Sequence, residues 1–345
     1  MGGRTAVTEP RGKHSRAPSR VRRRSLFWIL GAVVVAAVVA GAVASYNAVQ
    51  GPGTQVASQR AAGIPTGPSH GQLKEAAAAP MTTPSATASE SAVPVMSAAG
   101  HADPFSAAAT GYLATRTGTV LAAVYDVKTG QTWRLGQGGP QAEASVVKLD
   151  VLETLLAQRA RSTGLSASDR SLAQQMIEDS DNAAATDLWY EVGDGTGIRS
   201  FNTRAGLTQT SPSSCVVCAG FSWPGWGLST TTPGDQLTLL KQLIRPGSLL
   251  SDADRDYALS LMENVTADQR WGVSGGVPAG VTVALKNGWL PLKGTDSDWQ
   301  INSVGSISGD GRDYLMAVLT TGNPAEQYGI NTIDQLAAMV WQRMK

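Results

Sequence analysis

The stretch ASVVKLDVLETLL, residues 144–156, decides the fold of this chain. Its apolar residues recur every three or four positions, which is the spacing of one face of an amphipathic helix. Ser145 and Lys148 stand at the start of that face, and residues three apart lie on the same side of a helix. A hydroxyl and an amine therefore face whatever the apolar stripe faces. Taken alone, the same spacing also fits a helix cap at Ser145 and a Lys148 that extends to solvent.

Outward from this helix, apolar periodicity predicts the remaining elements. Strands are expected at 119–136 (a hairpin), 281–289, 299–309 and 312–322. Helices are expected at 145–158, 171–193, 197–205, 233–245, 252–264 and 325–344. Two strands, a block of helices, three antiparallel strands and a closing helix predict an α+β fold. Its antiparallel sheet is flanked by helices and carries an inserted all-helical subdomain.

Charge is distributed unevenly along the 345 residues, although the net charge is only +1. Residues 1–24 hold eight Lys or Arg and one Glu, which leaves 20 basic and 26 acidic residues in the remainder. A mildly acidic body without a basic stripe argues against a nucleic-acid partner.

The N-terminal third divides into three segments. A basic cytoplasmic leader (1–24) precedes a transmembrane anchor (25–45), because the uncharged run 26–44 would span roughly 29 Å as a helix, about the thickness of a bilayer core. The leading arginines favour a cytoplasmic N-terminus and an extracellular body in the cell membrane. The alternative is a secreted protein cleaved near Ala44. An Ala/Ser/Pro-rich disordered tether (46–103) follows, and the folded domain is expected at 104–345.

Histidine and cysteine usage narrows the chemistry. The three histidines, at 14, 70 and 101, lie in the leader and the tether. A folded unit without histidine excludes Ser-His-Asp catalysis and nearly all catalytic zinc sites, so no metal or cofactor is predicted. Cys215 and Cys218 are expected to form a local disulfide in an exported protein, with two free thiols as the alternative.

Two further motifs accompany the opening pair. SDN, at 180–182, lies where one helical run ends and the next begins, and its hydroxyl and amide suit a proton relay and a substrate carbonyl. KNG, at 286–288, ends a strand, where a lysine can meet a carboxylate and a glycine permits close approach. Each motif alone is an ordinary cap or turn.

Together, in this order, the three motifs resemble those of class A serine β-lactamases and related penicillin-binding proteins. The resemblance covers about 105–345 and includes TTTP at 230–233, which is similar to the exit of the Ω-loop of that family. It implies an acylated nucleophile at Ser145 and a general base at Lys148. It further implies an exported serine hydrolase whose partner is a β-lactam or a peptidoglycan-like small substrate.

The resemblance also implies roles for the other motif residues. Ser180 serves the proton relay, and the oxyanion hole consists of the backbone N–H groups of Ser145 and Trp289. The substrate-binding residues implied are Asn182, Lys286, Asn287, Gly288 and Trp289. The oligomeric state is not indicated.

Two departures from the family pattern affect the expected chemistry. Asn287 replaces the hydroxyl residue that is usual at the middle of the third motif. No Asp or Glu occurs from Gly195 to Gly234, so the Ω-loop lacks the glutamate that activates the deacylating water in the family. Slow deacylation is therefore expected. A glutamate inserted near Val216 is one way to restore turnover.

Three functions remain open at the level of sequence. The first is a β-lactamase-like serine hydrolase acting on β-lactams or related amides. The second is a DD-peptidase or penicillin-binding protein acting on peptidoglycan peptides. The third is a binding or sensing module with little turnover. Exposure to a penicillin separates them by turnover, by a stable adduct or by the lack of any reaction.

Overall fold

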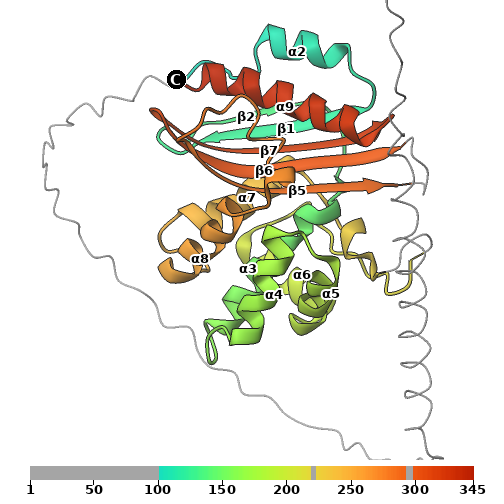
Figure 1. Ribbon diagram of the computed structural model, residues 1–345, viewed down its shortest axis with the longest axis vertical. Coiled ribbons are helices and arrows are strands. Elements are labelled where there is room, and N and C mark those ends of the chain that lie inside the picture. Colours follow the sequence, from blue (N-terminus) through green and yellow to red (C-terminus); the bar gives the residue numbers. More distant parts are fainter. Residues whose placement is uncertain (1–100, 219–222, 293–297) are drawn as a thin grey trace, which may run out of the picture. The chain divides into compact units, whose positions relative to one another are not determined.

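An antiparallel sheet with the strand order β2-β1-β7-β6-β5 organises the structure (Figure 1). The computed structural model describes residues 101–218, 223–292 and 298–345. The strands are β1 (Thr119–Asp126), β2 (Thr132–Leu135), β5 (Thr282–Pro291), β6 (Trp299–Gly309) and β7 (Arg312–Asn323). The N-terminal hairpin thus pairs with the last strand, which brings the two ends of the domain together.

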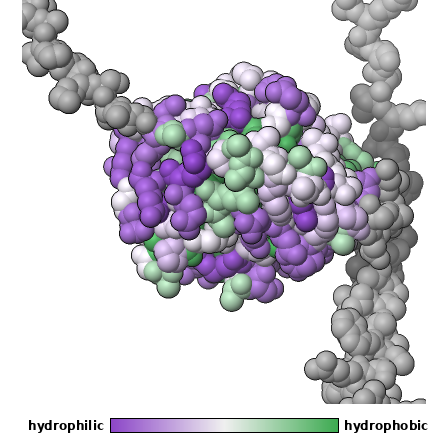
Figure 2. Space-filling view, turned by 90° about the horizontal axis from the view of Figure 1, so that it is seen from above, coloured by the Kyte–Doolittle hydropathy of each residue, from purple (hydrophilic) through white to green (hydrophobic). Residues whose placement is uncertain are grey.

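Helices cover both faces of this sheet. On one face lie α2 (Ala107–Ala114) and α9 (Glu326–Arg343), and on the other lie α7 (Pro233–Ile244) and α8 (Asp252–Glu263) (Figure 1). Seen from above, on the side of α2 and α9, the surface is mainly hydrophilic with small apolar patches (Figure 2). Two clusters of buried apolar residues, one on each face of the sheet, pack between the sheet and its helices.

The inserted block consists of α3 (Val147–Arg159), α4 (Ala167–Glu178), α5 (Asn182–Glu191) and α6 (Asp194–Ala205). Along α3 every residue from Val147 to Ala157 is buried, because the neighbouring helices surround it. The α+β class, the antiparallel sheet and the inserted helical subdomain predicted from the sequence are confirmed.

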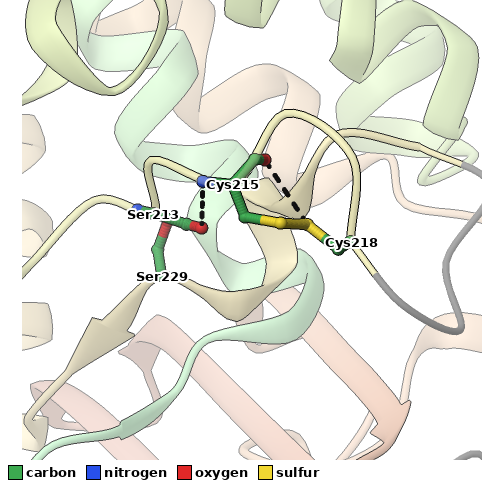
Figure 3. Close-up of a disulfide and its surroundings, with 4 residues drawn as sticks. All are labelled: Ser213, Cys215, Cys218 and Ser229. Atoms are coloured by element: carbon green, nitrogen blue, oxygen red, sulfur yellow. Dashed lines mark hydrogen bonds between the residues drawn. A yellow bond between two sulfur atoms is a disulfide. The ribbon is translucent and has the colours of Figure 1, made fainter.

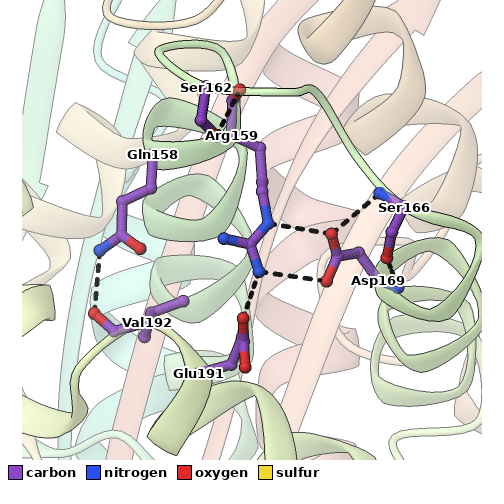
Figure 4. A network of polar contacts seen from close by, with 7 residues as sticks. All are labelled: Gln158, Arg159, Ser162, Ser166, Asp169, Glu191 and Val192. Atoms are coloured by element: carbon purple, nitrogen blue, oxygen red, sulfur yellow. Dashed lines mark hydrogen bonds and ion pairs between the residues drawn. The ribbon is translucent and has the colours of Figure 1, made fainter.

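Arg159 ties three helices of this block together at the end of α3 (Figure 4). Its Nε donates to Asp169 Oδ2 of α4 at 2.9 Å, and its Nη2 also donates to Glu191 Oε1 of α5. Asp169 completes a capping box with Ser166, which fixes the first turn of α4. The α3–α4 connection is thereby held against α5.

Three details differ from the sequence prediction. Ser145 lies in a 3₁₀ turn (Ala144–Val146) that precedes α3, not in the α-helix itself. The run 171–193 is two helices, because Ser180 adopts a left-handed φ of +54° between them. The sequence pattern also missed α2 and a second, two-stranded sheet formed by β3 (Gln141–Ala142) and β4 (Thr230–Thr231).

Nearly all of the N-terminal segments predicted from the sequence lie outside the described residues. These are the leader, the anchor and the tether up to residue 100. Within the described ranges no helix is both long enough and apolar enough to cross a bilayer. His101 is described, and its Nδ1 lies 2.7 Å from Asp126 Oδ2 at the end of β1. The prediction of a folded unit without histidine is therefore wrong, because this contact adds His101 to the sheet edge.

Three carboxylic acids near the start of α3 are fully buried and have no ion pair in the described part of the chain: Glu143, Asp150 and Glu153. Burial raises the pKa of each above its ordinary value, that of Asp150 to about 7. Asp150 Oδ2 accepts a hydrogen bond from Asn202 Nδ2 at 2.8 Å. Neither oxygen of Glu153 has a partner among the described residues. Glu153 is consequently neutral in the folded protein over a pH range where the unfolded chain ionises it.

Glu153→Gln is expected to make the free energy of unfolding less sensitive to alkaline pH. A raised pKa in the folded state contributes stability below the ordinary Glu pKa of about 4.3, and that contribution is lost as the pH rises. The advantage of the variant should grow from pH 5 to pH 8 by up to about 1.4 kcal/mol per pH unit. Urea unfolding at several pH values measures this difference.

Glu263→Gln, at an exposed position of α8, is the matched control and should follow the wild-type pH dependence. Parallel curves for wild type and Glu153→Gln would show that Glu153 ionises in the folded protein as freely as in the unfolded chain.

Candidate active site

The turn that carries Ser145 is held from two sides. Asn302 of β6 donates through Nδ2 to the carbonyl oxygens of Ala142 and Glu143, each at 2.9 Å. The N–H of Glu143 donates to the carbonyl of Ser229 at 2.7 Å. Ala144 then takes a left-handed φ of +49°, an uncommon conformation for a residue with a side chain. These bonds fix the chain direction immediately before Ser145.

Strand β5 passes directly over this turn at Gly288. A Cβ at this position would lie 2.6 Å from the backbone nitrogen of Ser145 and 2.8 Å from that of Val146. Only glycine permits this approach, which explains the glycine of the third motif. Because β5 is the outermost strand of the sheet, part of its backbone faces the turn and not another strand. The backbone N–H groups of Ser145 and Trp289 as an oxyanion hole are compatible with this arrangement.

Lys148 is completely buried on the first turn of α3. Its Nζ lies 2.5 Å from the carbonyl oxygen of Ser180, 3.0 Å from Ser180 Oγ and 2.8 Å from Asn182 Oδ1. Among the described residues its hydrogen-bond partners are thus in the second motif and do not include Ser145. The left-handed backbone of Ser180 turns both of its oxygens toward this amine.

Lys286 reaches the same serine from the sheet. Its Nζ lies 2.9 Å from Ser180 Oγ and 3.0 Å from the carbonyl oxygen of Asn287, and the residue is fully buried. The hydroxyl of Ser180 therefore lies between two lysine amines that come from different halves of the fold. The structure brings together the lysines of the first and third motifs and the serine of the second.

Burial in this apolar setting disfavours the charged form of both amines. Burial lowers the pKa of Lys148 to about 6, and repulsion from Lys286 contributes while the Asp181 carboxylate acts in the opposite direction. Burial lowers the pKa of Lys286 to about 7. A neutral Lys148 has a lone pair and can accept a proton near neutral pH, as a general base must.

Asn287 points away from this group. Its Nδ2 donates to the carbonyl oxygens of Gln269 and Trp271, at 2.7 and 3.0 Å. The amide is buried, and its N–H groups are bonded to the loop before β5. It faces away from Lys286 because successive residues of a strand point to opposite sides. The side chain of Asn287 is therefore turned toward that loop, while Lys286 and Gly288 face Ser145 and Ser180.

A cavity of about 220 Å³ opens beside these residues. Ser145, Ser180 and Asn182 lie on its polar side. Its other walls are the backbone of Ala144 and Gly227 and the apolar residues Trp223, Trp226, Trp289, Leu290, Pro291 and Trp299. Within the described ranges no acidic residue lines this cavity.

The loop that ends at β4 supplies a tryptophan ring that lies close to Lys148. The base of this loop is closed by the backbone pairing of Ser211 with Thr230, and β4 pairs with β3 just before the turn that carries Ser145. The Nζ of Lys148 lies 5.1 Å from the ring centroid of Trp226, whose Nε1 donates to Thr186 Oγ1 at 3.2 Å. Among the described residues, the loop thus places an aromatic ring against Lys148.

Cys215 and Cys218 are joined in a disulfide on the same loop (Figure 3). The N–H of Gly225, one residue before Trp226, donates to the carbonyl of Cys215 at 2.7 Å. Ser213 accepts from the N–H of Cys215 and is itself fixed by Ser229. The disulfide therefore braces the turn that places Trp226. Val216, between the two cysteines, is 64% exposed and does not line the cavity.

The tryptophans of the cavity and Asn302 were not predicted as site residues, apart from Trp289. The sequence feature that could have indicated the tryptophans is their concentration, because five of the nine lie between 223 and 299. No local pattern marks Asn302, because its contacts depend on the pairing of β6 with β5.

A family model described as "Beta-lactamase enzyme family" matches residues 156–344, more than half of the chain. The chain belongs to the beta-lactamase enzyme family. The matched residues include the second and third motifs. The match begins after Ser145 and Lys148, so the assignment of the first motif depends on its sequence and on the geometry described above.

Among curated proteins the chain is similar to the putative lipoprotein LppW of Mycobacterium tuberculosis and of Mycobacterium bovis. The identity is 30% over 214 residues, which is 58% of this chain and 62% of each relative. The chain thus spans less than two thirds of the length of these relatives.

Solved structures share the fold at low identity. The TLA-1 extended spectrum β-lactamase has a TM-score of 0.61 at 18% identity, over 70% of this chain and 98% of its own. A class A β-lactamase from Mycobacterium abscessus has a TM-score of 0.54 at 23% identity, over 68% of this chain and 96% of its own. PBP-A has a TM-score of 0.56 at 20% identity, over 67% and 92%. These likenesses confirm the fold predicted from the three motifs.

The rate of acylation at low substrate concentration is expected to have its maximum between about pH 6 and pH 7. Below about 6 Lys148 is protonated and cannot accept a proton, and above about 7 Lys286 loses the charge that the resemblance assigns to binding a substrate carboxylate. Stopped-flow measurement with a chromogenic β-lactam from pH 5 to pH 9 gives the profile.

The methyl ester of the same β-lactam is the control, because it lacks the carboxylate and should lose only the alkaline decline. A rate that still rises above pH 8 with the free acid would contradict a neutral Lys148 at neutral pH.

Proposed function

We propose that this chain is an exported, membrane-anchored serine hydrolase that forms an acyl-enzyme through Ser145 with β-lactams or related amides. The observation that carries the proposal is the meeting of two buried lysines at one serine hydroxyl, Ser180, beside the cavity that Ser145 lines. Two amines buried in such proximity are costly to keep charged, and groups with pKa values shifted in this way are typical of catalytic sites.

In the proposed reaction, Lys148 takes the proton of Ser145 as Oγ attacks the substrate carbonyl. The new Oγ–C bond forms while the negative charge on the carbonyl oxygen is stabilised by the backbone N–H groups of Ser145 and Trp289. The C–N bond then breaks, and the nitrogen receives its proton through the hydroxyl of Ser180. Lys286 holds a carboxylate of the substrate, and Asn182 its amide carbonyl.

Deacylation is proposed to be slow. Hydrolysis of the ester needs a base that activates water, and none of the described residues lining the cavity is acidic. The ring of Trp226 instead lies over Lys148. The absence of a positioned general base typically costs about 10²–10⁴-fold in rate. A PBP-A variant with glutamate in place of a leucine, 20% identical to this chain, has been solved as an acyl-enzyme complex with penicillin G.

Membrane association is also part of the proposal. The relatives are named putative lipoproteins. This chain has no cysteine before Cys215, so a lipid on a cysteine near residues 26–44 is not available to it. We infer that the uncharged run itself is the anchor, with the domain outside the cell.

Incubation with benzylpenicillin is expected to add one penicillin mass to the protein, and the adduct should persist for minutes or longer. Ser145→Ala should abolish the adduct, because the attacking oxygen is removed. Lys148→Ala should slow adduct formation by about 10²-fold or more, because the general base is lost. Intact mass spectrometry measures both.

Ser168→Ala, at an exposed position of α4, is the matched control and should form the adduct at the wild-type rate. Rapid steady-state hydrolysis without an accumulating adduct would contradict slow deacylation. A peptidase of the penicillin-binding type would in addition cleave a D-Ala-D-Ala peptide, and a binding module would form no adduct.

Trp226→Glu is expected to shorten the lifetime of the adduct by about tenfold or more, at the lower end of what a general base contributes. The substitution places a carboxylate beside Lys148, where a water could be activated, which Val216 on the outer side of the disulfide cannot do. Trp226→Gln is the matched control, since it removes the ring without supplying a base. Equal adduct lifetimes in the two variants would show that the missing carboxylate is not the cause of slow turnover.

Fractionation of expressing cells is expected to recover the full-length chain with the membranes. Protease added to intact cells with a permeable outer layer should digest the domain and spare residues 1–24, because the anchor leaves the leader inside. Recovery of the domain from the culture fluid, beginning after Ala44, would favour cleavage and secretion.

A further inference from the structure

Positive charge without a counter-ion gathers between the edge strand β2 and helix α7. Arg134 lies on β2, Lys241 lies in the last turn of α7, and Arg245 is the C-cap of that helix. Within the described ranges none of the three forms an ion pair with a carboxylate. The chain after residue 24 has more acidic than basic residues, so a group of unpaired cations does not follow from its composition.

Strand pairing places Arg134 on the side of the sheet that α7 covers. Arg134 is directly opposite Ala123 of β1, and Ala123 packs in the apolar cluster to which α7 contributes. Residues directly opposite each other in an antiparallel pair point to the same face. A Cβ at Gly234, in the first turn of α7, would lie 3.7 Å from Arg134 Nη2. The guanidinium group therefore lies near the start of the helix, where the helix dipole disfavours a positive charge.

Tyr125 of β1 holds the other two cations together. Lys241 Nζ lies 3.8 Å from the centroid of the Tyr125 ring, and Arg245 Nη2 donates to the Tyr125 hydroxyl at 2.7 Å. Burial lowers the pKa of Lys241, and repulsion from Arg245 and Arg134 contributes. The charged groups that act on this amine from β2 and from the end of α7 are thus further cations. We call Arg134, Lys241, Arg245 and the Tyr125 ring the basic groove.

The basic groove is long compared with a single anionic group. Thr238, Lys241 and Arg245 follow one another at helical spacing and so lie along one side of α7. A cavity of about 360 Å³ opens at the Arg134 end, and Thr238 also lines it. From Gly234 to Arg245 the helix rises by roughly 16 Å, which exceeds the size of one phosphate or carboxylate. The groove therefore suits an elongated anion with several charges.

One carboxylate lines the cavity and does not neutralise the cations. Asp235 is 6% exposed, and its Oδ2 accepts from the N–H of Gln209 at 2.7 Å and from Thr210 Oγ1 at 2.8 Å. It is not within ion-pair distance of Arg134. The charged side chains that remain open to an occupant are two guanidinium groups and an ammonium group, which only donate hydrogen bonds.

A groove of charged donors selects an occupant that presents acceptors. A phosphodiester chain offers acceptor oxygens along its backbone, and guanidinium groups bind phosphate in a bidentate manner. A peptide would bring an N–H group at nearly every residue toward cations that cannot accept it. A single-stranded nucleic acid gains affinity by stacking its bases on aromatic rings, but the Tyr125 ring is 6% exposed and lies against Lys241.

We propose that the basic groove binds a linear phosphodiester polymer without bases, with one phosphate at each of Arg134, Lys241 and Arg245. The cavity at the Arg134 end and the cavity beside Ser145 share no lining residue, so the polymer leaves the residues around Ser145 uncovered. The proposal goes beyond acyl transfer and does not depend on it.

Protection of Lys241 from acetylation tests the site in the unaltered, full-length chain. The probe is an oligomer of glycerol phosphate of defined length, added to the protein in a neutral detergent at low salt. Peptide mass spectrometry then gives the acetylation rate of each lysine. The oligomer is expected to slow acetylation of Lys241 several-fold, because a bound phosphate shields the amine and favours its charged form. Lys128, an exposed lysine in the turn between β1 and β2, is the internal control and should react at an unchanged rate.

The salt dependence of binding counts the phosphate contacts. Fluorescence anisotropy with a labelled oligomer gives the slope of log affinity against log salt concentration, to which each contact with a flexible phosphodiester contributes about −0.7. Arg134→Gln and Arg245→Gln should each make the slope shallower by about this amount. Arg161→Gln, which removes an exposed cation between α3 and α4, is the matched control and should leave the slope unchanged. The basic leader is present in every variant, so its contribution to the slope cancels in these differences.

The outcomes separate this proposal from the proposed function. Unchanged acetylation of Lys241 in the presence of the oligomer would overturn the site, whatever the variants show. Equal protection by monomeric glycerol phosphate at the same phosphate concentration would overturn a polymer as the occupant. Stronger protection by polyglutamate or by oligothymidylate of equal charge would overturn a phosphodiester without bases. The benzylpenicillin adduct on Ser145 is measured on the same samples, and its loss with protection retained would overturn acyl transfer alone.

Discussion

The approach of two backbones at Gly288 is the constraint on which the rest of this structure depends. At that residue the edge strand lies against the nitrogens of Ser145 and Val146, closer than any side chain permits. The sheet and the helical block meet there, with Asn302 holding the preceding carbonyls from the sheet side. Because this contact fixes the turn that carries Ser145 relative to the third motif, the two lysines can converge on one hydroxyl from opposite sides.

That convergence also explains why the two lysines are costly to bury in their charged form. Each amine is removed from water and offered neutral oxygens as its hydrogen-bond partners, so the charged form is disfavoured in the folded state. The oxygens that surround Lys148 belong to Ser180 and Asn182, at a break between two helices. A straight helix across this position would turn Ser180 away from Lys148.

Much of the fold and part of the site followed from local patterns in the sequence. Helical and strand periodicity predicted the order of the elements, and three short motifs predicted which of them meet. The direction of the Asn287 side chain, the role of Asn302 and the ring of Trp226 over Lys148 did not follow. Each depends on strand pairing or on the path of an irregular loop, which long-range contacts determine and single-residue propensities do not. His101 was assigned to the tether for a similar reason, because its partner Asp126 lies 25 residues farther along the chain and no local pattern indicates the contact.

The pairing of β3 with β4 has a consequence for how this protein can vary. The last residues of the loop that carries Trp223 and Trp226 pair with the residues that lead into Ser145. The N–H of Glu143 also donates to the carbonyl of Ser229. The loop can thus exchange exposed side chains, such as those of Val216 and Val217, but a change in its length at this end would be transmitted to Ser145. Divergence of substrate range should therefore proceed by replacement within the loop, with insertions confined to the segment around the disulfide, farther along the chain from this pairing.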